Sequence, residues 1–205
     1  MPSSSQRKPI MNTEIICILD RSGSMRSTLQ DAIGGFNQFL HTQRDEPGEA
    51  RITTILFNQD MDTIYTGIPL ADAPEMDPET WFPMGRTALL DTLGFGLLQQ
   101  SYRMSKDLWA DKVIVCILTD GLENASSNFK LPAVAAMIKE KEAEGWSFVF
   151  LGANQDAFHV ADSMGMSPDN VMNYEATGLG TRDAFLRMSR SSSELRRARN
   201  RREDS

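Results

Sequence analysis

Two stretches of the chain are almost continuously apolar, and they constrain the fold more than any other feature. The first covers residues 14–19 and contains IICIL, and the second covers residues 112–119 and reads KVIVCILT. A strand with one face in water alternates polar and apolar side chains, so an unbroken apolar run is typical of a strand buried on both faces. Residues 26–42 follow the first run and carry apolar side chains at helical spacing, at Leu29, Ile33, Phe36 and Leu40. This succession predicts a parallel sheet covered by helices.

The rest of the chain continues the alternation. Further strands are expected over residues 50–58, 62–70, 146–152 and 170–174. Further helices are expected over residues 87–103, from Leu131 towards Gly145, over 155–164 and over 181–193. Strands 50–58 and 62–70 are close enough to form a hairpin, and the proline in the second places it at a sheet edge. The expected fold class is α/β and Rossmann-like: a doubly wound, mostly parallel central sheet with one antiparallel edge strand and helices on both faces.

Length and composition are those of one globular domain. The 205 residues are 40% hydrophobic, which supplies ample core. No apolar run approaches the roughly 20 residues of a membrane helix, and the N-terminus lacks the apolar segment of a signal peptide. Cys17 and Cys116 lie inside the two apolar runs, where reduced thiols pack as small hydrophobic groups. We therefore expect a cytoplasmic protein with no membrane association.

Charge is distributed unevenly along the chain. The net charge is −7, which argues against a generic nucleic-acid binder, yet residues 187–205 carry seven arginines against three acids. The sequence predicts a flexible extension over residues 1–11, a domain over 12–193 and a basic, disordered tail over 194–205. Association of this tail with an acidic partner or a nucleic acid stays open as an accessory role.

Oxygen-bearing side chains cluster where the apolar strands end. Asp20, Ser22 and Ser24 follow the first run at alternate positions, Asp120 follows the second run, and Thr87 begins a predicted helix. Ligands of open parallel sheets bind outside the carboxyl ends of the strands, which is where these residues are expected. A set of carboxylates and hydroxyls without Cys or His suits a hard cation, Mg²⁺ first, with Mn²⁺ or Ca²⁺ as alternatives.

Three motifs in this order resemble the von Willebrand factor type A (VWA) family. They are DRSGSM at 20–25, GRT at 85–87 and TDG at 119–121, and together they match the three parts of that family's metal-ion-dependent adhesion site. The resemblance covers roughly residues 12–190. The stretch FLGANQDAFHVADSMGM, followed by FLRMS, is most similar to small intracellular bacterial or phage members.

The resemblance implies specific roles. Ser22 and Ser24 would bind the metal directly, Thr87 directly or through water, and Asp20 and Asp120 mostly through water. Neutral direct ligands leave the cation much of its charge, so a Glu or Asp of a partner protein is a favoured further ligand. The implied function is a non-catalytic, metal-dependent protein-binding module and not an enzyme. Small intracellular relatives often work beside ring-forming ATPases or in larger assemblies.

Other interpretations of the same residues remain. Asp20 or Ser24 could cap the helix that follows, and Asp120 with Gly121 could form a simple turn. An aspartate after a strand also opens phosphotransferases that form an aspartyl phosphate, so a Mg²⁺-dependent phosphotransferase or phosphatase using Asp20 is an alternative. Such enzymes need a second carboxylate two residues on and a nearby lysine. Position 22 is a serine, and no lysine adjoins the three motifs.

Overall fold

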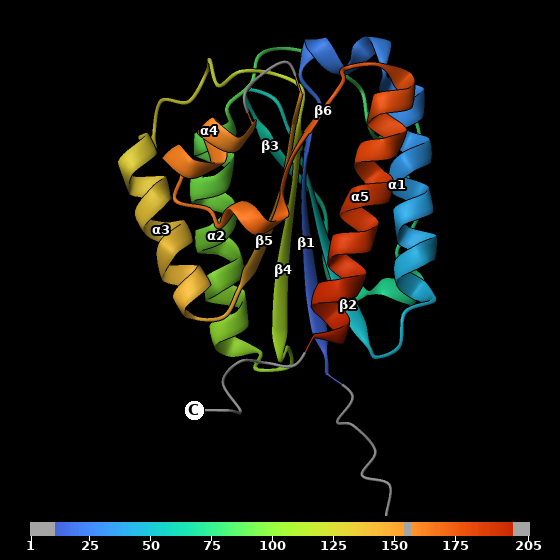
Figure 1. The fold of residues 1–205 in the computed structure, drawn as a ribbon, viewed down its shortest axis with the longest axis vertical. Helices are drawn as coiled ribbons and strands as arrows, with labels where there is room; N and C mark the ends of the chain where they lie inside the picture. Colours follow the sequence, from blue (N-terminus) through green and yellow to red (C-terminus); the bar gives the residue numbers. More distant parts are fainter. Residues whose placement is uncertain (1–10, 154–156, 199–205) are drawn as a thin grey trace, which may run out of the picture.

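The computed structural model describes residues 11–153 and 157–198. Within these residues a six-stranded sheet is enclosed between two layers of helices (Figure 1). The strands are β1 (Thr13–Asp20), β2 (Ala50–Phe57), β3 (Met61–Pro69), β4 (Lys112–Thr119), β5 (Ser147–Ala153) and β6 (Val171–Tyr174). Their order is β3-β2-β1-β4-β5-β6, and only the β2–β3 pair is antiparallel. The predicted fold class, including the antiparallel edge strand, is confirmed.

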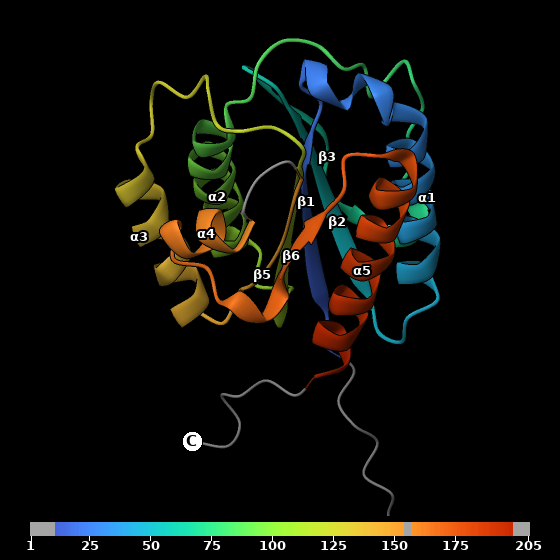
Figure 2. The same ribbon diagram turned by 45° about the horizontal axis from the view of Figure 1, so that its top comes forward.

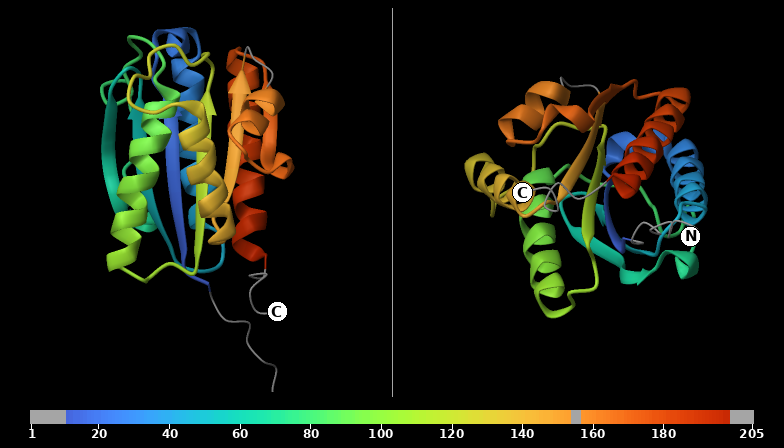
Figure 3. Two further views of the ribbon diagram at one scale, coloured as in Figure 1. Left: turned by 90° about the vertical axis from the view of Figure 1, so that its left-hand side faces the viewer. Right: turned by 60° about the horizontal axis from the view of Figure 1, so that its bottom comes forward.

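Helices cover both faces of the sheet. α1 (Leu29–Arg44) and α5 (Gly178–Arg197) lie on one face, as the two perpendicular views in Figures 1 and 3 show. The opposite face is covered by α2 (Leu89–Lys106), α3 (Leu131–Ala143) and α4 (Ala157–Ser163). None of the described helices is both long and apolar enough to cross a membrane.

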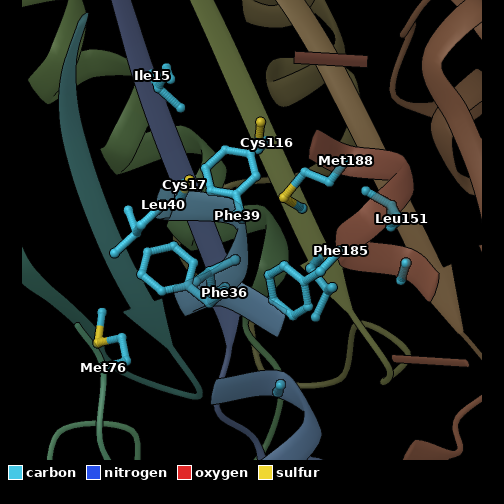
Figure 4. Packing of buried hydrophobic residues seen from close by; sticks show 14 of the residues in the cluster. Ile15, Cys17, Phe36, Phe39, Leu40, Met76, Cys116, Leu151, Phe185 and Met188 are labelled. Atoms are coloured by element: carbon cyan, nitrogen blue, oxygen red, sulfur yellow. The ribbon is translucent and has the colours of Figure 1, made fainter. Parts of the chain in front are cut away.

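The two faces of β1 and β4 explain their unbroken apolar sequences. Alternate residues of β1 enter different cores, with Cys17 facing α1 and α5 and Ile18 facing α2. Figure 4 shows the first core, where Phe36 and Phe185 meet beside β1. Cys17 is paired in register with Cys116 of β4, and both thiols are free and buried, as expected.

The helix nearest the first motif begins later than predicted. A 3-10 helix (Gly23–Ser27) follows β1, and α1 starts at Leu29. Likewise α2 starts at Leu89, so Thr87 lies in the loop before the helix. Ser22 and Thr87 therefore lie outside the regular elements, while Asp20 ends β1 and Ser24 lies in the 3-10 helix.

The predicted start of the basic tail at residue 194 is wrong, because α5 continues to Arg197. The guanidinium group of Arg196 is buried and donates to the main-chain oxygens of Gln43, at 2.5 Å, and Gly48, at 3.0 Å. The Nζ of Lys112 donates to the carbonyl oxygens of Leu195 and Arg196, each at 2.9 Å, and of Ala198. These bonds satisfy the carbonyls that a helix end leaves unpaired. Residues 1–10 and 199–205 of the predicted extensions lie outside the described residues.

The segment between β3 and α2 is long and irregular but firmly anchored. The side-chain amide of Asn37 of α1 donates to the main-chain oxygen of Met76 at 2.9 Å and accepts the main-chain N–H of Met76 at 2.8 Å. Trp81 is fully buried, with its ring centroid 6.3 Å from that of Phe36 and 6.4 Å from that of Phe185. This anchoring fixes the backbone that carries Thr87.

The edge strand β3 is irregular. Its register against β2 shifts on both sides of Thr54, and Gly67 has a φ of 57°, a conformation that favours glycine. The N–H of Gly67 bonds to the side chain of Thr53 at 2.9 Å. The strand ends at Pro69.

Candidate metal centre

The candidate site lies where the strand order reverses. From β1 the chain proceeds to β2 and β3 on one side, and then returns to β4 on the other side of β1. Asp20 ends β1 and Asp120 follows β4, so both carboxylates lie at the switch point between these strands. Figure 2 turns this end of the molecule towards the viewer. The location agrees with the general rule for ligand sites in open α/β sheets.

Asp20 ties the two strand ends together. Its side chain is fully buried; one oxygen accepts the main-chain N–H of Ser22 at 2.6 Å, and the other accepts the hydroxyl of Thr119 at 2.6 Å. Its main-chain oxygen accepts the indole N–H of Trp81 at 3.1 Å. Asp20 therefore shapes the turn that presents the two serines.

A chain of hydroxyls runs from Ser22 to Asp120. The hydroxyl oxygens of Ser22 and Ser24 are 2.9 Å apart, and Ser24 donates to a carboxylate oxygen of Asp120 at 2.5 Å. Because the single hydroxyl proton of Ser24 is used on Asp120, Ser22 must be the donor to Ser24. Ser22 and Asp120, at the two ends of the chain, are buried, whereas Ser24 between them is exposed, so the chain reaches the surface at Ser24.

Thr87 joins this group from the loop before α2. A Cβ built on Gly121 would lie 2.7 Å from the Thr87 hydroxyl and 3.6 Å from the Ser24 hydroxyl, so both oxygens border Gly121. Asn124 fixes Thr87 by accepting its N–H at 3.0 Å and donating its own N–H to the Thr87 carbonyl at 3.0 Å. The N–H of Gly23 bonds to the oxygen of Gly85 at 3.1 Å and joins the first two motifs. The structure thus brings all five predicted side chains together.

The donor set and its spacing fit a small hard cation. Neighbouring ligands of an octahedral Mg²⁺ ion with bonds near 2.1 Å are about 3.0 Å apart, and the Ser22 and Ser24 hydroxyl oxygens are 2.9 Å apart. Among the described residues, no group of three or more His, Cys, Asp and Glu side chains could hold a metal. Binding here would therefore depend on the hydroxyls together with the two carboxylates.

Burial makes both carboxylates hold protons more strongly than usual. Burial, with a smaller contribution from the charge of Asp120, raises the pKa of Asp20 from 3.8 to about 6, although hydrogen bonds from Thr119 and Ser22 oppose the shift. Burial also raises the pKa of Asp120, against the hydrogen bond from Ser24. A cation nearby would favour the charged form of both carboxylates and would offset the free-energy cost of ionising them in a buried position.

These shifts predict that metal affinity falls in mildly acidic solution. Between pH 3.8 and about pH 6, the two pKa values of Asp20, the folded chain keeps a proton on this carboxylate that the unfolded chain has already lost. The metal-free protein therefore gains stability from this group as the pH falls through that window, while a cation has to displace the proton. We expect the Mg²⁺ dissociation constant, measured by calorimetry, to change little above about pH 7 and to rise up to about tenfold per pH unit below about pH 6. An affinity that is constant down to about pH 5 would contradict this account of Asp20.

Three residues beside the site were not identified as functional from the sequence. Thr119 was part of the TDG motif but was given no role of its own, and its hydroxyl holds Asp20 across the strand pair. Trp81 lies in a segment with no periodic pattern. Tyr174 of β6 is buried, and its hydroxyl has no hydrogen-bond partner among the described residues. Burial, with smaller contributions from the charges of Asp120 and Asp20, raises the pKa of Tyr174 well above its usual value.

Comparison with known proteins identifies the fold. No protein-family model and no curated protein matches the sequence. Proximal thread matrix protein 1 from the mussel byssus, in a structure with a zinc-occupied metal-ion-dependent adhesion site, is 13% identical with a TM-score of 0.61; the alignment covers 90% of this chain and 46% of that protein. The chain thus spans about half the length of that neighbour.

Two bacterial neighbours have the same fold. The von Willebrand factor domain of the type V pili tip protein Mfa5 from Porphyromonas gingivalis is 11% identical with a TM-score of 0.64, over 94% of this chain and 98% of that chain. The PilB minor pilin from Streptococcus sanguinis is 11% identical with a TM-score of 0.68, over 93% of this chain and 63% of that chain. The fold is therefore VWA-like.

Proposed function

We propose that this VWA-like domain is a non-catalytic module that binds a protein partner through a divalent cation, with Mg²⁺ as the ion. The observation that carries the proposal is the hydrogen-bond chain from buried Ser22 through exposed Ser24 to buried Asp120. Helix capping does not account for it, because neither serine hydroxyl bonds to a main-chain N–H of the following helices. A structural neighbour with zinc in its adhesion site supports a divalent cation.

The residues present would leave a bound cation attractive to an acid. Ser22, Ser24 and Thr87 would offer neutral oxygens, while Asp20 is held by Thr119 and Ser22 in a buried position suited to orienting a ligand. A cation held by neutral oxygens would supply positive charge at the surface, where a Glu or Asp of the partner could complete its coordination. The exposed side chains of Arg26 and Arg86 add positive charge to this end of the molecule.

Apolar side chains close to the site extend the proposed interface. Phe82 follows Trp81, which bonds to Asp20; Met84 donates its N–H to the oxygen of Arg21 at 2.9 Å; and Leu122 follows Gly121. Phe82, Met84 and Leu122 are all exposed large hydrophobic residues. Such side chains beside a polar anchor are typical of protein interfaces. We infer a partner segment in which apolar residues flank the acid.

The enzyme alternative has little support from the geometry. An aspartyl phosphate would require a carboxylate oxygen of Asp20 to attack a phosphate, yet Asp20 is fully buried and both of its oxygens accept hydrogen bonds. The neighbours are named as pilus and byssus proteins, which is consistent with binding or structural roles.

We also propose a cytoplasmic location, and a ring-forming ATPase or a larger assembly as the partner. Two free, buried thiols are what a reducing compartment would leave. Fractionation of the source cells would test the location: recovery in an extracellular or surface fraction would contradict it.

The proposed function is tested by capture in the presence and absence of metal. The immobilised protein should retain a partner from a native extract in Mg²⁺ and release it in EDTA. Ser24→Ala should lose this capture, because a direct ligand is gone, whereas the matched change at exposed Ser27 should keep it. The retained protein should then lose binding when one of its acidic residues is neutralised. Capture that is indifferent both to EDTA and to Ser24→Ala would reject the proposal.

A further inference from the structure

The outer face of α2 carries three large apolar side chains that the described chain leaves uncovered. Phe95, Leu98 and Tyr102 expose 44%, 54% and 69% of their surfaces. Their spacing of three and then four residues places them in one line along the helix, as the core positions of a coiled coil are. The left-hand view of Figure 3 faces this side of the molecule, and no other described helix lies over α2 there. These three residues are called the α2 stripe below.

The opposite face of α2 already attaches the helix to the sheet. Leu89, Leu93 and Leu97 are buried in the core that α2 forms with β1 and β2. The stripe is therefore not needed to hold the helix in place, yet a helix that is apolar on opposite faces is typical of one covered on both. Since a large aromatic side chain has about 150–250 Å² of surface, the stripe exposes roughly 300 Å², the size of a patch that is often functional.

The first residue of the stripe is held in a fixed position. The rings of Phe95 and Phe129 meet edge to face, with their centroids 5.0 Å apart. A Cβ built on Gly94 would lie 2.4 Å from the ring of Phe129, so the missing side chain lets this ring lie against the helix. Asp91 anchors the segment that carries Phe129 by accepting the N–H of Ser127 at 2.9 Å and that of Phe129 at 2.7 Å. A surface fixed before binding loses less conformational entropy on association.

Opposite charges lie at the two ends of the stripe. Asp91 lies four residues before Phe95, and Lys106 lies four residues after Tyr102. Neither charge belongs to an ion pair within the part of the chain that the structure describes. The Lys106 ammonium group lies 5.4 Å from the centroid of the Tyr102 ring, on the same face of the helix. The order acid, aromatic, leucine, aromatic, base is complementary to its own reverse.

We propose that the α2 stripe binds the α2 stripe of a second copy of this chain, with the two helices antiparallel about a two-fold axis. This pairing sets Phe95 of each copy against Tyr102 of the other and brings the two Leu98 side chains together at the axis. It also brings Asp91 of each copy towards Lys106 of the other, whereas a parallel pair would place like charges together. The stripe is smaller than the roughly 800 Å² that each partner of a standard interface buries, so the expected dissociation constant lies in the micromolar range.

Analytical ultracentrifugation over a range of protein concentrations tests the dimer. The wild type should change from monomer to dimer between low micromolar and millimolar concentration. Leu98→Glu should weaken association at least about 100-fold, because each dimer loses two apolar contacts and gains two facing negative charges. Leu186→Glu is the matched control, since Leu186 of α5 is 49% exposed, and it should dimerise as the wild type does. A monomer at every concentration, or equal weakening by both substitutions, would overturn the proposal.

Disulfide formation tests the antiparallel register. Both natural cysteines are fully buried, so an introduced surface cysteine provides the reactive thiol. Leu98→Cys should form a disulfide between two copies under mild oxidation. Exposed Ser105→Cys should not, because its two copies would be about 20 Å apart along the helices, against the 7 Å or less that a disulfide requires. Ready cross-linking of Ser105→Cys would indicate parallel helices and overturn the register.

The dimer and the proposed metal site are tested independently. None of the five predicted metal-site residues belongs to the stripe, so EDTA and Ser24→Ala should leave the dimer unchanged while they abolish metal-dependent capture. Dimerisation that requires Mg²⁺ would overturn the pairing through α2. A monomeric wild type whose capture of another protein is lost in Leu98→Glu and kept in Leu186→Glu would overturn the second copy in favour of a different partner.

Discussion

Asp120→Asn is expected to weaken Mg²⁺ binding about 10–100-fold, the range seen when an acidic partner of metal ligands is removed. Asp120 accepts the hydroxyl proton of Ser24 at 2.5 Å and would contribute one of the two negative charges of the proposed metal site. Asparagine keeps the size of the side chain but loses the charge. Calorimetric titration of Mg²⁺ into both proteins measures the effect.

The controls for this titration separate charge from folding. Ser24→Ala should weaken binding at least as much, because a direct ligand is removed without a change in net charge. Asp183→Asn removes an exposed carboxylate that is paired with Arg187 on α5, and should bind Mg²⁺ as the wild type does. Equal dissociation constants in wild type, Asp120→Asn and Ser24→Ala would mean that the five side chains do not form a metal site.

Trp81→Ala should lower the free energy of unfolding by about 3–5 kcal/mol, as expected for a large buried aromatic residue. The ring is fully buried between the sheet, Phe36 of α1 and Phe185 of α5. Its N–H also holds the main-chain oxygen of Asp20 at 3.1 Å. Urea unfolding followed by circular dichroism measures the loss.

Two further variants resolve the roles of Trp81. Trp81→Phe keeps an aromatic ring but leaves the Asp20 oxygen without its donor, so it should cost less stability and still weaken Mg²⁺ binding. Trp109→Ala removes a partly exposed tryptophan that stacks on Arg51, 4.3 Å from the ring centroid, and should be far milder. A Trp81→Ala protein as stable as Trp109→Ala would show that the segment before α2 is not anchored by this ring.

The central strands were predictable because their environment is uniform. Strand β4 occupies residues 112–119, the range predicted, since burial on both faces requires an unbroken apolar run. The end of α5 was not predictable in this way. Its C-terminal part buries Ser189, Ser193 and Arg196 against Gln43 of α1, and polar residues in a core leave no hydrophobic periodicity to recognise.

The candidate site was predictable in its members but not in its support. Its five side chains come from short motifs at strand and helix ends, which sequence order alone can place near one another. Thr119 and Trp81 act through the carboxylate and the carbonyl of Asp20, and such contacts depend on which strands are neighbours and how an irregular loop folds back. Neither the choice of neighbouring strands nor the path of the loop can be predicted from local sequence.

The irregular edge strand β3 has a consequence for assembly. Exposed sheet edges invite pairing with another chain, and a kinked, glycine-bearing strand that ends in proline presents a poor template for it. The edge of β3 therefore disfavours the addition of a strand from a second molecule through main-chain hydrogen bonds, so contacts at this edge would have to be made by side chains.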